Sequence, residues 1–392
     1  MAQQFRNLVI PEELKEVPRE NLIKSRKQIA RQKSDIRAKI KEDTCLYCGK
    51  TVSSFCNSHS VPAFCLRSIK GAYGDGRIFN PNHILKIPVV DEDAGIKNTG
   101  TFQIICNDCD NKIFQDYEDE KCFETSPSGQ ILNAIALKNY LARIASTRLT
   151  KADFEFLSQM GIQSNYLSDS EAYKKFEERL PSVMYCASKA TANERDLEDY
   201  MAGFKVAKRA KERGWNDEYH LFYFEKLPYT VPVAFQLCFP VILDLEGNVI
   251  NNVYNYSPNV KEKDLHLCIF PMEESSCLLA FTHRKDSSSY RLFFRQLKGL
   301  SLDDQLSLLL YLVLLYSEKV FFSKLLPKSV FENEDFVKAV QQNSDILADS
   351  LPRTPKEFHE FLKSGYSLKS YKKIPPLLSE QYSMQNLSEN HA

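Results

Sequence analysis

Residues 45–49 read Cys-Leu-Tyr-Cys-Gly, residues 106–110 read Cys-Asn-Asp-Cys-Asp, and residues 57–62 between them read Asn-Ser-His-Ser-Val-Pro. A Cys-x-x-Cys pair places two thiolates on one tight turn, and two such turns can close a four-sulfur zinc cage. We therefore expect one structural zinc ion on Cys45, Cys48, Cys106 and Cys109. Such a zinc would stabilise the fold without taking part in catalysis, because four thiolates fill its coordination sphere. The open alternative is four buried thiols without a metal.

The motifs around these cysteines resemble those of a known family. Cys-x-x-Cys-Gly, then Ser-His-x-x-Pro, then Phe-x-x-x-Cys-x-x-Cys-Asp is similar to an HNH-type nuclease domain. The resemblance implies a small zinc-stapled ββα-metal fold, treble-clef-like, whose β-hairpin and helix form the active site. It also implies that His59 is the general base that activates water, beside a divalent cation, Mg²⁺ or Mn²⁺, on the scissile phosphate. The matching region, residues 45–118, covers about a fifth of the chain.

The resemblance extends to further site residues, with departures. Asp110 stands where the family often has an Asn or His ligand of the catalytic cation, and a carboxylate suits magnesium. Asn98 is the best match for the asparagine that orients the base. Ser58 stands where an acidic residue or a second His is common, and a hydroxyl is a poor ligand. Asn80 and Asn82 are alternatives to Asn98 for this role. Further candidates in the next predicted helix are Asn111, Glu118 and Lys112, the last as a phosphate contact.

His59 also allows readings unrelated to catalysis. It lies three residues after Cys56, so Cys56-x-x-His59 could itself be a zinc knuckle, or His59 could only hydrogen-bond the loop. Histidine nevertheless suits the role of general base, because an imidazole can accept a proton near neutral pH. These readings stay open at the level of sequence.

Residues 1–44 form a basic arm ahead of the first cysteine pair. Between residues 21 and 41, eight Lys and Arg side chains stand against a single acid, Asp35, and isoleucines recur at helical spacing. We expect a helix whose Lys24, Lys27 and Arg31 contact phosphates next to the active site. A solvated helix that packs through its isoleucines is the other open reading.

Residues 126–214 follow the nuclease-like domain, residues 45–125, and have a helical pattern. Apolar residues recur at helical spacing over 131–144, 169–180 and 194–213. The second half of the last predicted helix is basic and could extend a DNA-binding track. Its basic residues are Lys205, Lys208, Arg209 and Lys211.

Residues 215–378 predict an α+β module of unknown role. Strands are predicted over 220–224, 231–245, 265–270 and 276–282. Helices are predicted over 288–297, 302–322, 333–342 and 355–363. Residues 379–392 read as a disordered tail. The whole chain is therefore predicted to be α+β.

Composition limits the function classes. The 392 residues include 51 basic and 51 acidic side chains, so no overall field draws the chain to nucleic acid, and binding must come from local patches. The first residues lack the apolar core of a signal peptide, and the longest apolar run, 306–316, is too short for a membrane span. Of the eleven cysteines, the seven outside the two Cys-x-x-Cys pairs have no framework spacing, which indicates a reducing compartment. We expect a cytoplasmic protein without membrane contact.

Two functions from different classes follow. The first is a metal-dependent endonuclease, for DNA in the first instance, whose C-terminal module senses a signal or binds a regulatory protein partner, as in bacterial defence or mobile elements. The second is a non-catalytic, zinc-stapled nucleic-acid-binding or scaffold protein. The second would keep the four cysteines and the basic arm without using His59 and Asp110 together.

Overall fold

The computed structural model describes residues 31, 34–36, 38–70, 77–78, 94–95, 100–163, 170–255, 257, 259–317, 319–345 and 354–390. Its centre is a five-stranded sheet in the order β5-β8-β7-β6-β9, in which all neighbouring strands are antiparallel. The strands are β5 (Tyr219–Leu227), β6 (Val233–Pro240), β7 (Asp264–Pro271), β8 (Ser276–His283) and β9 (Val320–Phe322). The predicted α+β class is confirmed, and the four predicted strands match β5 to β8.

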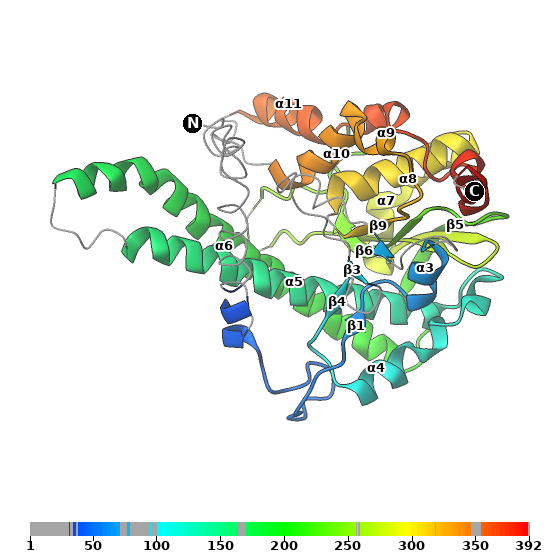
Figure 1. Cartoon of the computed structure of the whole chain (residues 1–392), viewed down its shortest axis with the longest axis horizontal. Coiled ribbons are helices and arrows are strands. Elements are labelled where there is room, and N and C mark those ends of the chain that lie inside the picture. The colour runs from blue at the N-terminus through cyan, green and yellow to red at the C-terminus, as the bar shows by residue number, and fades with distance from the viewer. Residues whose placement is uncertain are drawn as a thin grey trace.

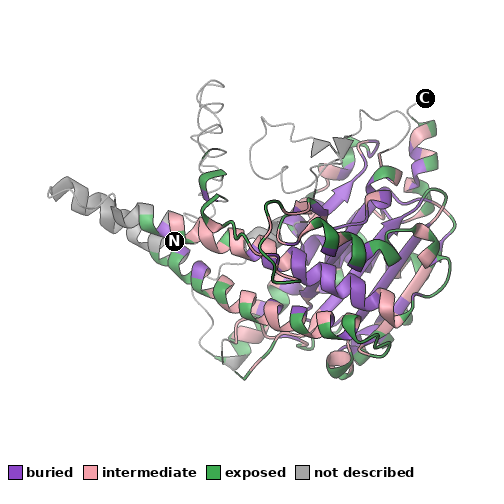
Figure 2. Ribbon diagram, turned by 90° about the horizontal axis from the view of Figure 1, so that it is seen from below, coloured by how far each residue is buried: buried purple, intermediate pink, exposed green. Residues whose placement is uncertain are grey.

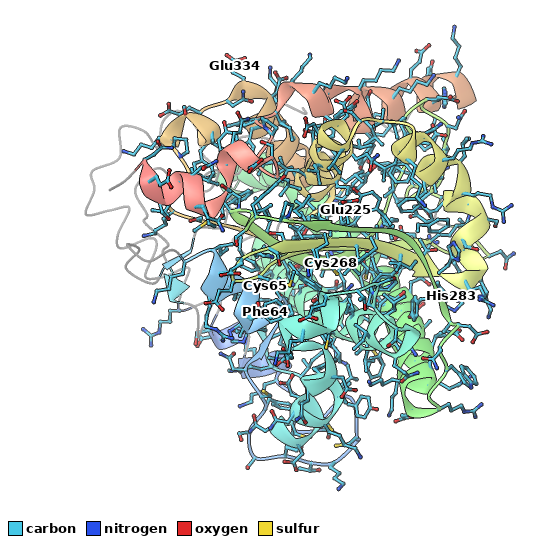
Figure 3. All side chains as sticks on the ribbon, turned by 90° about the vertical axis from the view of Figure 1, so that its right-hand side faces the viewer. Phe64, Cys65, Glu225, Cys268, His283 and Glu334 are labelled. Carbon is cyan, nitrogen blue, oxygen red and sulfur yellow. The ribbon has the colours of Figure 1, made fainter. Side chains whose placement is uncertain are left out.

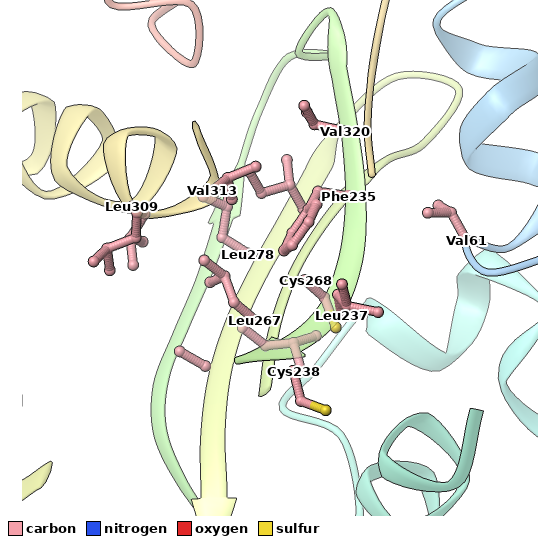
Figure 4. Close-up of a cluster of buried hydrophobic side chains, with 14 of the residues drawn as sticks. Val61, Phe235, Leu237, Cys238, Leu267, Cys268, Leu278, Leu309, Val313 and Val320 are labelled. Carbon is pink, nitrogen blue, oxygen red and sulfur yellow. The ribbon is translucent and has the colours of Figure 1, made fainter. Parts of the chain in front are cut away.

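Both faces of the sheet are covered (Figure 1). Helices α7 (Ser287–Lys298) and α8 (Leu302–Tyr316) lie on one face, and α5 (Gly129–Gln163) lies on the other. Side chains alternate between the faces of a strand. Figure 4 accordingly shows sheet residues between Leu309 of α8 on one side and Val61 on the other. This double cover explains why nearly every residue of β6, β7 and β8 is buried.

The cysteine-rich element, residues 43–70 and 100–123, packs on the same face as α5. It contains β1 (Ser58–His59), β4 (Thr101–Phe102), α3 (Ala63–Ser68), α4 (Asn107–Phe114), and the 3₁₀ turns η4 (Gln115–Tyr117) and η5 (Glu120–Phe123). Figure 3 shows Phe64 and Cys65 of α3 beside Cys268 of β7. The rings of Phe64 and Phe270 meet edge to face at 6.3 Å. A further strand pair, β2 (Arg77–Ile78) with β3 (Ala94–Gly95), lies between β1 and β4 in the chain.

Helix α5 is the central helix of the molecule. Every residue from 132 to 142 is buried, including the polar residues Asn133, Lys138 and Asn139. The sheet, the cysteine-rich element and helix α6 (Ser170–Glu212) enclose it. The helix is therefore not amphipathic, because it has no solvent face along this stretch. Figure 2 shows the buried residues concentrated in the sheet and in the helices against it.

Helices α5 and α6 form a long antiparallel helix pair that extends beyond the sheet (Figure 1). The prediction of three helices over 126–214 is wrong, because α6 joins the second and third of them through Pro181. A proline in a helix interior removes one hydrogen bond and clashes with the carbonyl group four residues before it, at a cost of about 3 kcal/mol. Packing on α5 supports the joined segment, since Cys186 and Ala190 of α6 are buried.

The predicted helix over 302–322 ends at Tyr316, and residues Val320–Phe322 form β9 instead. The three residues pair with β6, so that Val233 lies opposite Phe322. A partner strand supplied by tertiary contact thus overrides the local helical pattern. The helices that follow are α9 (Lys328–Phe331), α10 (Glu334–Asp345) and α11 (Pro355–Tyr366).

Residues 379–390 are ordered, so the prediction of a disordered tail over 379–392 is wrong for this part. After η7 (Leu368–Lys373) the chain forms η8 (Glu380–Tyr382) and α12 (Met384–Glu389). The Met384 N–H donates to the Thr230 carbonyl oxygen at 2.8 Å, and Leu387 is only 5% exposed. Apolar burial fixes this segment despite its polar composition.

One hydrophobic core runs through the described residues, from Cys45 to Leu387. It joins the cysteine-rich element, α5, α6, the sheet and the C-terminal helices. The four boundaries between the five predicted segments stay predictions. Among the described residues, no helix combines the length and the apolar character needed to cross a membrane.

His266 on β7 gives the core a measurable pH dependence. Its ring is fully buried, stacks on Phe281, and places Nδ1 3.0 Å from Asn139 Nδ2. Burial, with a smaller contribution from the charge of His283, lowers the pKa of His266 to about 3. The pKa of histidine in an unfolded chain is about 6.5. Between these values the unfolded state holds more protons, so the free energy of unfolding falls as the pH falls below about 6.5.

The variant His266→Phe should remove this dependence, because phenylalanine keeps the ring stack and cannot titrate. Between pH 7 and pH 4.5, the wild type should lose about 2–3 kcal/mol of unfolding free energy that the variant does not lose. Urea denaturation of both proteins at both pH values measures this difference. Glu262 and Asp264 have raised pKa values, which change the free energy of unfolding with pH in the opposite direction. Their contributions are common to both proteins and cancel in the comparison. An equal pH dependence of wild type and variant would contradict the prediction.

Candidate metal centre and catalytic site

The first cysteine pair lies on a tight turn. A β-bridge between Thr44 and Thr51 closes the base of this turn, and the Gly49 N–H donates to the Cys45 carbonyl oxygen at 2.8 Å. Gly49 has a φ of +72°, a region that side chains disfavour. The glycine directly after Cys48 is therefore required by the backbone that presents both sulfurs.

The second cysteine pair lies at the start of α4. Cys106 immediately precedes the helix, and Cys109 belongs to its first turn. Burial raises the pKa values of the Cys106 and Cys109 thiols, whereas the free N–H groups and the positive dipole end of the helix N-terminus act in the opposite direction and favour thiolates. The Leu46 N–H donates to the Ile104 carbonyl oxygen at 2.9 Å, which ties the first turn to the segment before the second pair.

The four sulfurs of Cys45, Cys48, Cys106 and Cys109 all lie within 4.8 Å of one another. A tetrahedral site with Zn–S bonds of about 2.3 Å needs sulfur separations of about 3.8 Å, so the group fits zinc. The Cys106 N–H donates to Cys45 Sγ at 3.3 Å. Although burial opposes it, hydrogen bonds from backbone N–H groups lower the pKa of Cys45 to about 7, which favours the thiolate ligand. The predicted four-cysteine group is confirmed as a group that can hold a metal ion.

Neither Cys56 nor His59 belongs to this four-cysteine group. The alternative of a Cys56-x-x-His59 knuckle therefore lacks a place in the metal centre. Zinc, if bound, is held by four thiolates, and His59 stays outside its coordination sphere. This is the arrangement that the spacing of the cysteines predicts.

His59 lies on the short strand β1, which pairs antiparallel with β4. Ser58 is opposite Phe102, and His59 is opposite Thr101. The β-hairpin that the resemblance implies is not a local one over residues 51–59, because the partner strand of β1 lies some forty residues further along the chain. The pairing places the His59 strand next to the segment that leads into Cys106 and α4.

Asp110 on α4 is bound by the strand of His59. Ser58 is 1% exposed, and its hydroxyl donates to Asp110 Oδ1. Ser58 thus donates to the Asp110 carboxylate and orients it. Burial and the neighbouring Asp110 carboxylate raise the pKa of the Cys56 thiol to about 11, so Cys56 stays protonated beside that carboxylate.

Lys138 of α5 lies behind this group. It is fully buried, and its Nζ lies 2.5 Å from Glu118 Oε1. Sequence analysis singled out Glu118 but missed Lys138 and the roles of Ser58 and Cys56. The signal for Lys138 was available, because it is the one charged residue between 130 and 142.

A polar hollow of about 680 Å³ opens beside α4 and η4, lined by Asn111, Gln115, Glu118 and Asp119. Asn111 belongs to α4, whereas Gln115 belongs to η4 and Glu118 follows it, so the prediction that Glu118 lies on the same helix as Asn111 is wrong. Lys112 is exposed on the same helix.

Of the other predicted site residues, some lie within the described residues and the rest lie outside them. Arg31 is helical and exposed. Lys208 and Lys211 of α6 contact the cysteine-rich element, through the Tyr47 carbonyl oxygen and the Asp116 carboxylate. These two lysines hold the element in place, so they do not form a free basic track. Outside the described residues lie Asn98, Asn80, Asn82, Lys24 and Lys27.

Comparison with known proteins identifies no relative. No protein-family model, curated protein or solved structure matches this chain. The similarity to HNH-type nucleases rests on the motifs of residues 45–118 and stays a resemblance. The chemistry of the site is therefore inferred from its own side chains.

Proposed function

We propose that the chain is a metal-dependent endonuclease that hydrolyses phosphodiester bonds of nucleic acid, DNA in the first instance. One observation carries the proposal: the Ser58 hydroxyl binds the Asp110 carboxylate across 52 residues of sequence. This contact brings the strand of the proposed base, His59, to the helix of the proposed metal ligand. A base and a hard oxygen ligand on neighbouring elements suit attack of water on a phosphate.

Each residue has one role in this proposal. Structural zinc on the four cysteines holds the turn and the helix together, while His59 accepts a proton from the attacking water. Asp110 holds Mg²⁺ or Mn²⁺, with Ser58 fixing the carboxylate. The cation, when bound, supplies positive charge to the scissile phosphate and to the leaving oxygen. The Asn98 side chain is proposed to orient His59.

The partners follow from the same reasoning. Lys112 on α4 and Arg31 in the arm are exposed and suit phosphate contacts, and Lys24 and Lys27 belong to the same basic arm. We propose that the protein lies in the cytoplasm and that the C-terminal module, residues 215–378, binds a regulatory protein partner. The zinc-stapled HNH-like fold is part of the proposal.

A non-catalytic nucleic-acid-binding or scaffold protein is the second candidate. It is favoured by the engagement of Asp110 with Ser58 and Cys56, which occupies part of the carboxylate. Among the described residues, moreover, three or more ligands gather in one place at the four cysteines alone. A binding protein would need the cysteines and the basic residues, but no exchangeable cation.

Plasmid cleavage by the zinc-loaded full chain, with Mg²⁺ or Mn²⁺, tests the proposal. We expect Asp110→Asn to reduce cleavage about a hundredfold or more, because the amide is a weaker ligand for a hard cation and loses the charge. Asp108→Asn is the matched control, since Asp108 is exposed on the same helix. Wild type that binds zinc and DNA but cleaves neither DNA nor RNA with either cation would favour the second candidate.

A further inference from the structure

Trp215 is the only tryptophan of the chain, and its backbone is held firmly just after the end of α6. Gly214 has a φ of +69°, and the Trp215 N–H donates to the Ala210 carbonyl oxygen at 3.0 Å, as at many helix ends that close with a glycine. The Trp215 carbonyl oxygen accepts from the side-chain amides of Gln130 and Asn133 on α5. Bonds to two helices therefore fix the backbone of this residue.

The indole ring of Trp215 stays accessible in spite of this anchoring. An apolar residue at this position of a helix end commonly packs back on the helix. Trp215 is nevertheless 37% exposed. The Arg213 guanidinium lies over the indole, with its Cζ 5.2 Å from the ring centroid. An exposed indole with a guanidinium on it is a platform on which a further planar group can stack.

Two more cations continue from Arg213 along α6. Lys205, Arg209 and Arg213 follow one another at intervals of four residues, so they share one side of the helix. All three are exposed. Within the part of the chain that the structure describes, none of them has a carboxylate within ion-pair distance. Residues 205–217 contain five basic and two acidic side chains, so the segment is locally positive in a chain of zero net charge.

This end of α6 borders the cysteine-rich element. Lys208, which directly precedes Arg209, donates to the Tyr47 carbonyl oxygen, and its Nζ lies 4.7 Å from the centroid of the Tyr47 ring. Lys211 binds the Asp116 carboxylate of η4 at 2.8 Å. The exposed cations and the indole therefore lie along the edge of the element that carries the metal centre and the proposed catalytic residues.

We infer that Trp215, Arg213, Arg209 and Lys205 form a contact surface for single-stranded nucleic acid, in which an unpaired base stacks on Trp215 and phosphates contact the cations. Base–aromatic stacking accepts any base, because every base has a π-face, and cations along the backbone complete such a site. From Lys205 to Arg213 the helix rises about 12 Å, enough for several phosphates of one strand. The inference rests on nucleic-acid binding, which both candidate functions share, and not on cleavage.

The chemistry of the surface favours a nucleic acid over an acidic protein segment. Acidic side chains would meet the cations of α6 but would leave the indole without a planar partner. A nucleotide supplies both groups at once, a phosphate for Arg209 and a base for Trp215. The base must be unpaired, because the π-faces of a base inside a duplex are covered by its neighbours.

Tryptophan fluorescence of the zinc-loaded full chain tests the inference directly, because the signal comes from Trp215 alone. Without added Mg²⁺ or Mn²⁺, titration with an oligothymidylate of about 20 nucleotides should quench the fluorescence and reach saturation. A duplex of the same length and polyglutamate should each quench it much less. Fluorescence that oligothymidylate leaves unchanged would overturn the inference. Equal quenching by the duplex would overturn the single-strand assignment, and equal quenching by polyglutamate would assign the surface to an acidic protein.

Affinity for a labelled oligothymidylate, measured by fluorescence anisotropy, supplies the second readout. Trp215→Ala should raise the Kd about tenfold, whereas Trp215→Phe, which keeps a ring, should stay close to the wild type. Combining Lys205→Gln with Arg209→Gln should lower the salt dependence of log K by about 1.4, which is about 0.7 for each lost phosphate contact.

The matched control combines Lys328→Gln with Lys369→Gln. Both lysines are exposed, on α9 and η7, and the control removes the same charge, so its salt dependence should equal that of the wild type. A wild-type salt dependence in the Lys205 and Arg209 double variant would overturn the assignment of the cations. If Trp215→Ala does not fold, the fluorescence of the wild type decides.

The two proposals fail in different ways. A wild type that cleaves plasmid DNA, while oligothymidylate leaves the Trp215 fluorescence unchanged, would overturn the inference and leave the nuclease function standing. A wild type whose fluorescence is quenched, but which cleaves neither DNA nor RNA, would keep the contact surface and overturn the nuclease function. A wild type that does not bind oligothymidylate would overturn the inference outright.

Discussion

Cleavage by the variant His59→Ala should be about 10²–10⁴-fold slower than cleavage by the wild type, because the attacking water would lose its general base. His59 lies on β1, whose position is fixed by pairing with β4 and by the contact of Ser58 with Asp110. Alanine preserves both, since these contacts use the backbone of residue 59 and the side chain of its neighbour. The loss should therefore appear in the rate of cleavage and not in folding.

The measurement is plasmid cleavage at saturating Mn²⁺, together with zinc content and DNA affinity. His220→Ala is a suitable control, because His220 is exposed on β5, away from the cysteine-rich element. Zinc content and DNA affinity should match the wild type in both variants. Cleavage by His59→Ala at the wild-type rate would show that His59 is not the base.

Loss of the metal centre should have the largest effect on stability. Structural zinc in small peptides contributes about 10–16 kcal/mol of apparent binding free energy, which equals or exceeds the whole stability of a typical domain. In Cys109→Ser, whose hydroxyl is a poor zinc ligand, we expect bound zinc to fall below one equivalent. The cysteine-rich element should then unfold, because its strands β1 and β4 have two residues each and cannot stand alone.

Mass spectrometry of bound metal and hydrogen exchange measure these two effects. Fast exchange should spread over residues 43–70 and 100–118, whereas β6, β7 and β8 should stay protected. The matched control is Cys122→Ser, because the Cys122 sulfur lies outside the metal centre and donates to the Asp116 carbonyl oxygen, which a hydroxyl can also do. Full protection of the cysteine-rich element in a zinc-free Cys109→Ser would contradict a structural role for the metal.

Local sequence was sufficient to predict the metal centre. A Cys-x-x-Cys pair defines its own turn, and the glycine after Cys48 marks the backbone conformation of that turn. Only the meeting of the two pairs is a long-range event, and metal chemistry itself predicts that meeting. The strands β5 to β8 were predicted for a similar reason, because runs of β-branched and aromatic residues indicate strands in any context.

Contacts between distant segments could not be predicted from local sequence. The partner of β1 is a strand forty residues away, and β9 is a strand only because the edge of β6 is open to it. The apolar residues over 131–144 have the spacing of an amphipathic helix, whereas α5 is enclosed on all sides over 132–142. Burial of a helix depends on its neighbours, which periodicity along one segment does not report.

The contact between Lys208 and Tyr47 sets an order of events during synthesis on the ribosome. Lys208 Nζ lies over the Tyr47 ring at 4.7 Å, yet the two residues are 161 positions apart. At about 5–20 residues per second, the ribosome needs about 8–30 s to make the segment between them. The metal-binding turn therefore leaves the exit tunnel long before the helix that covers it. During this interval the Tyr47 ring is exposed to chaperones and to other nascent chains.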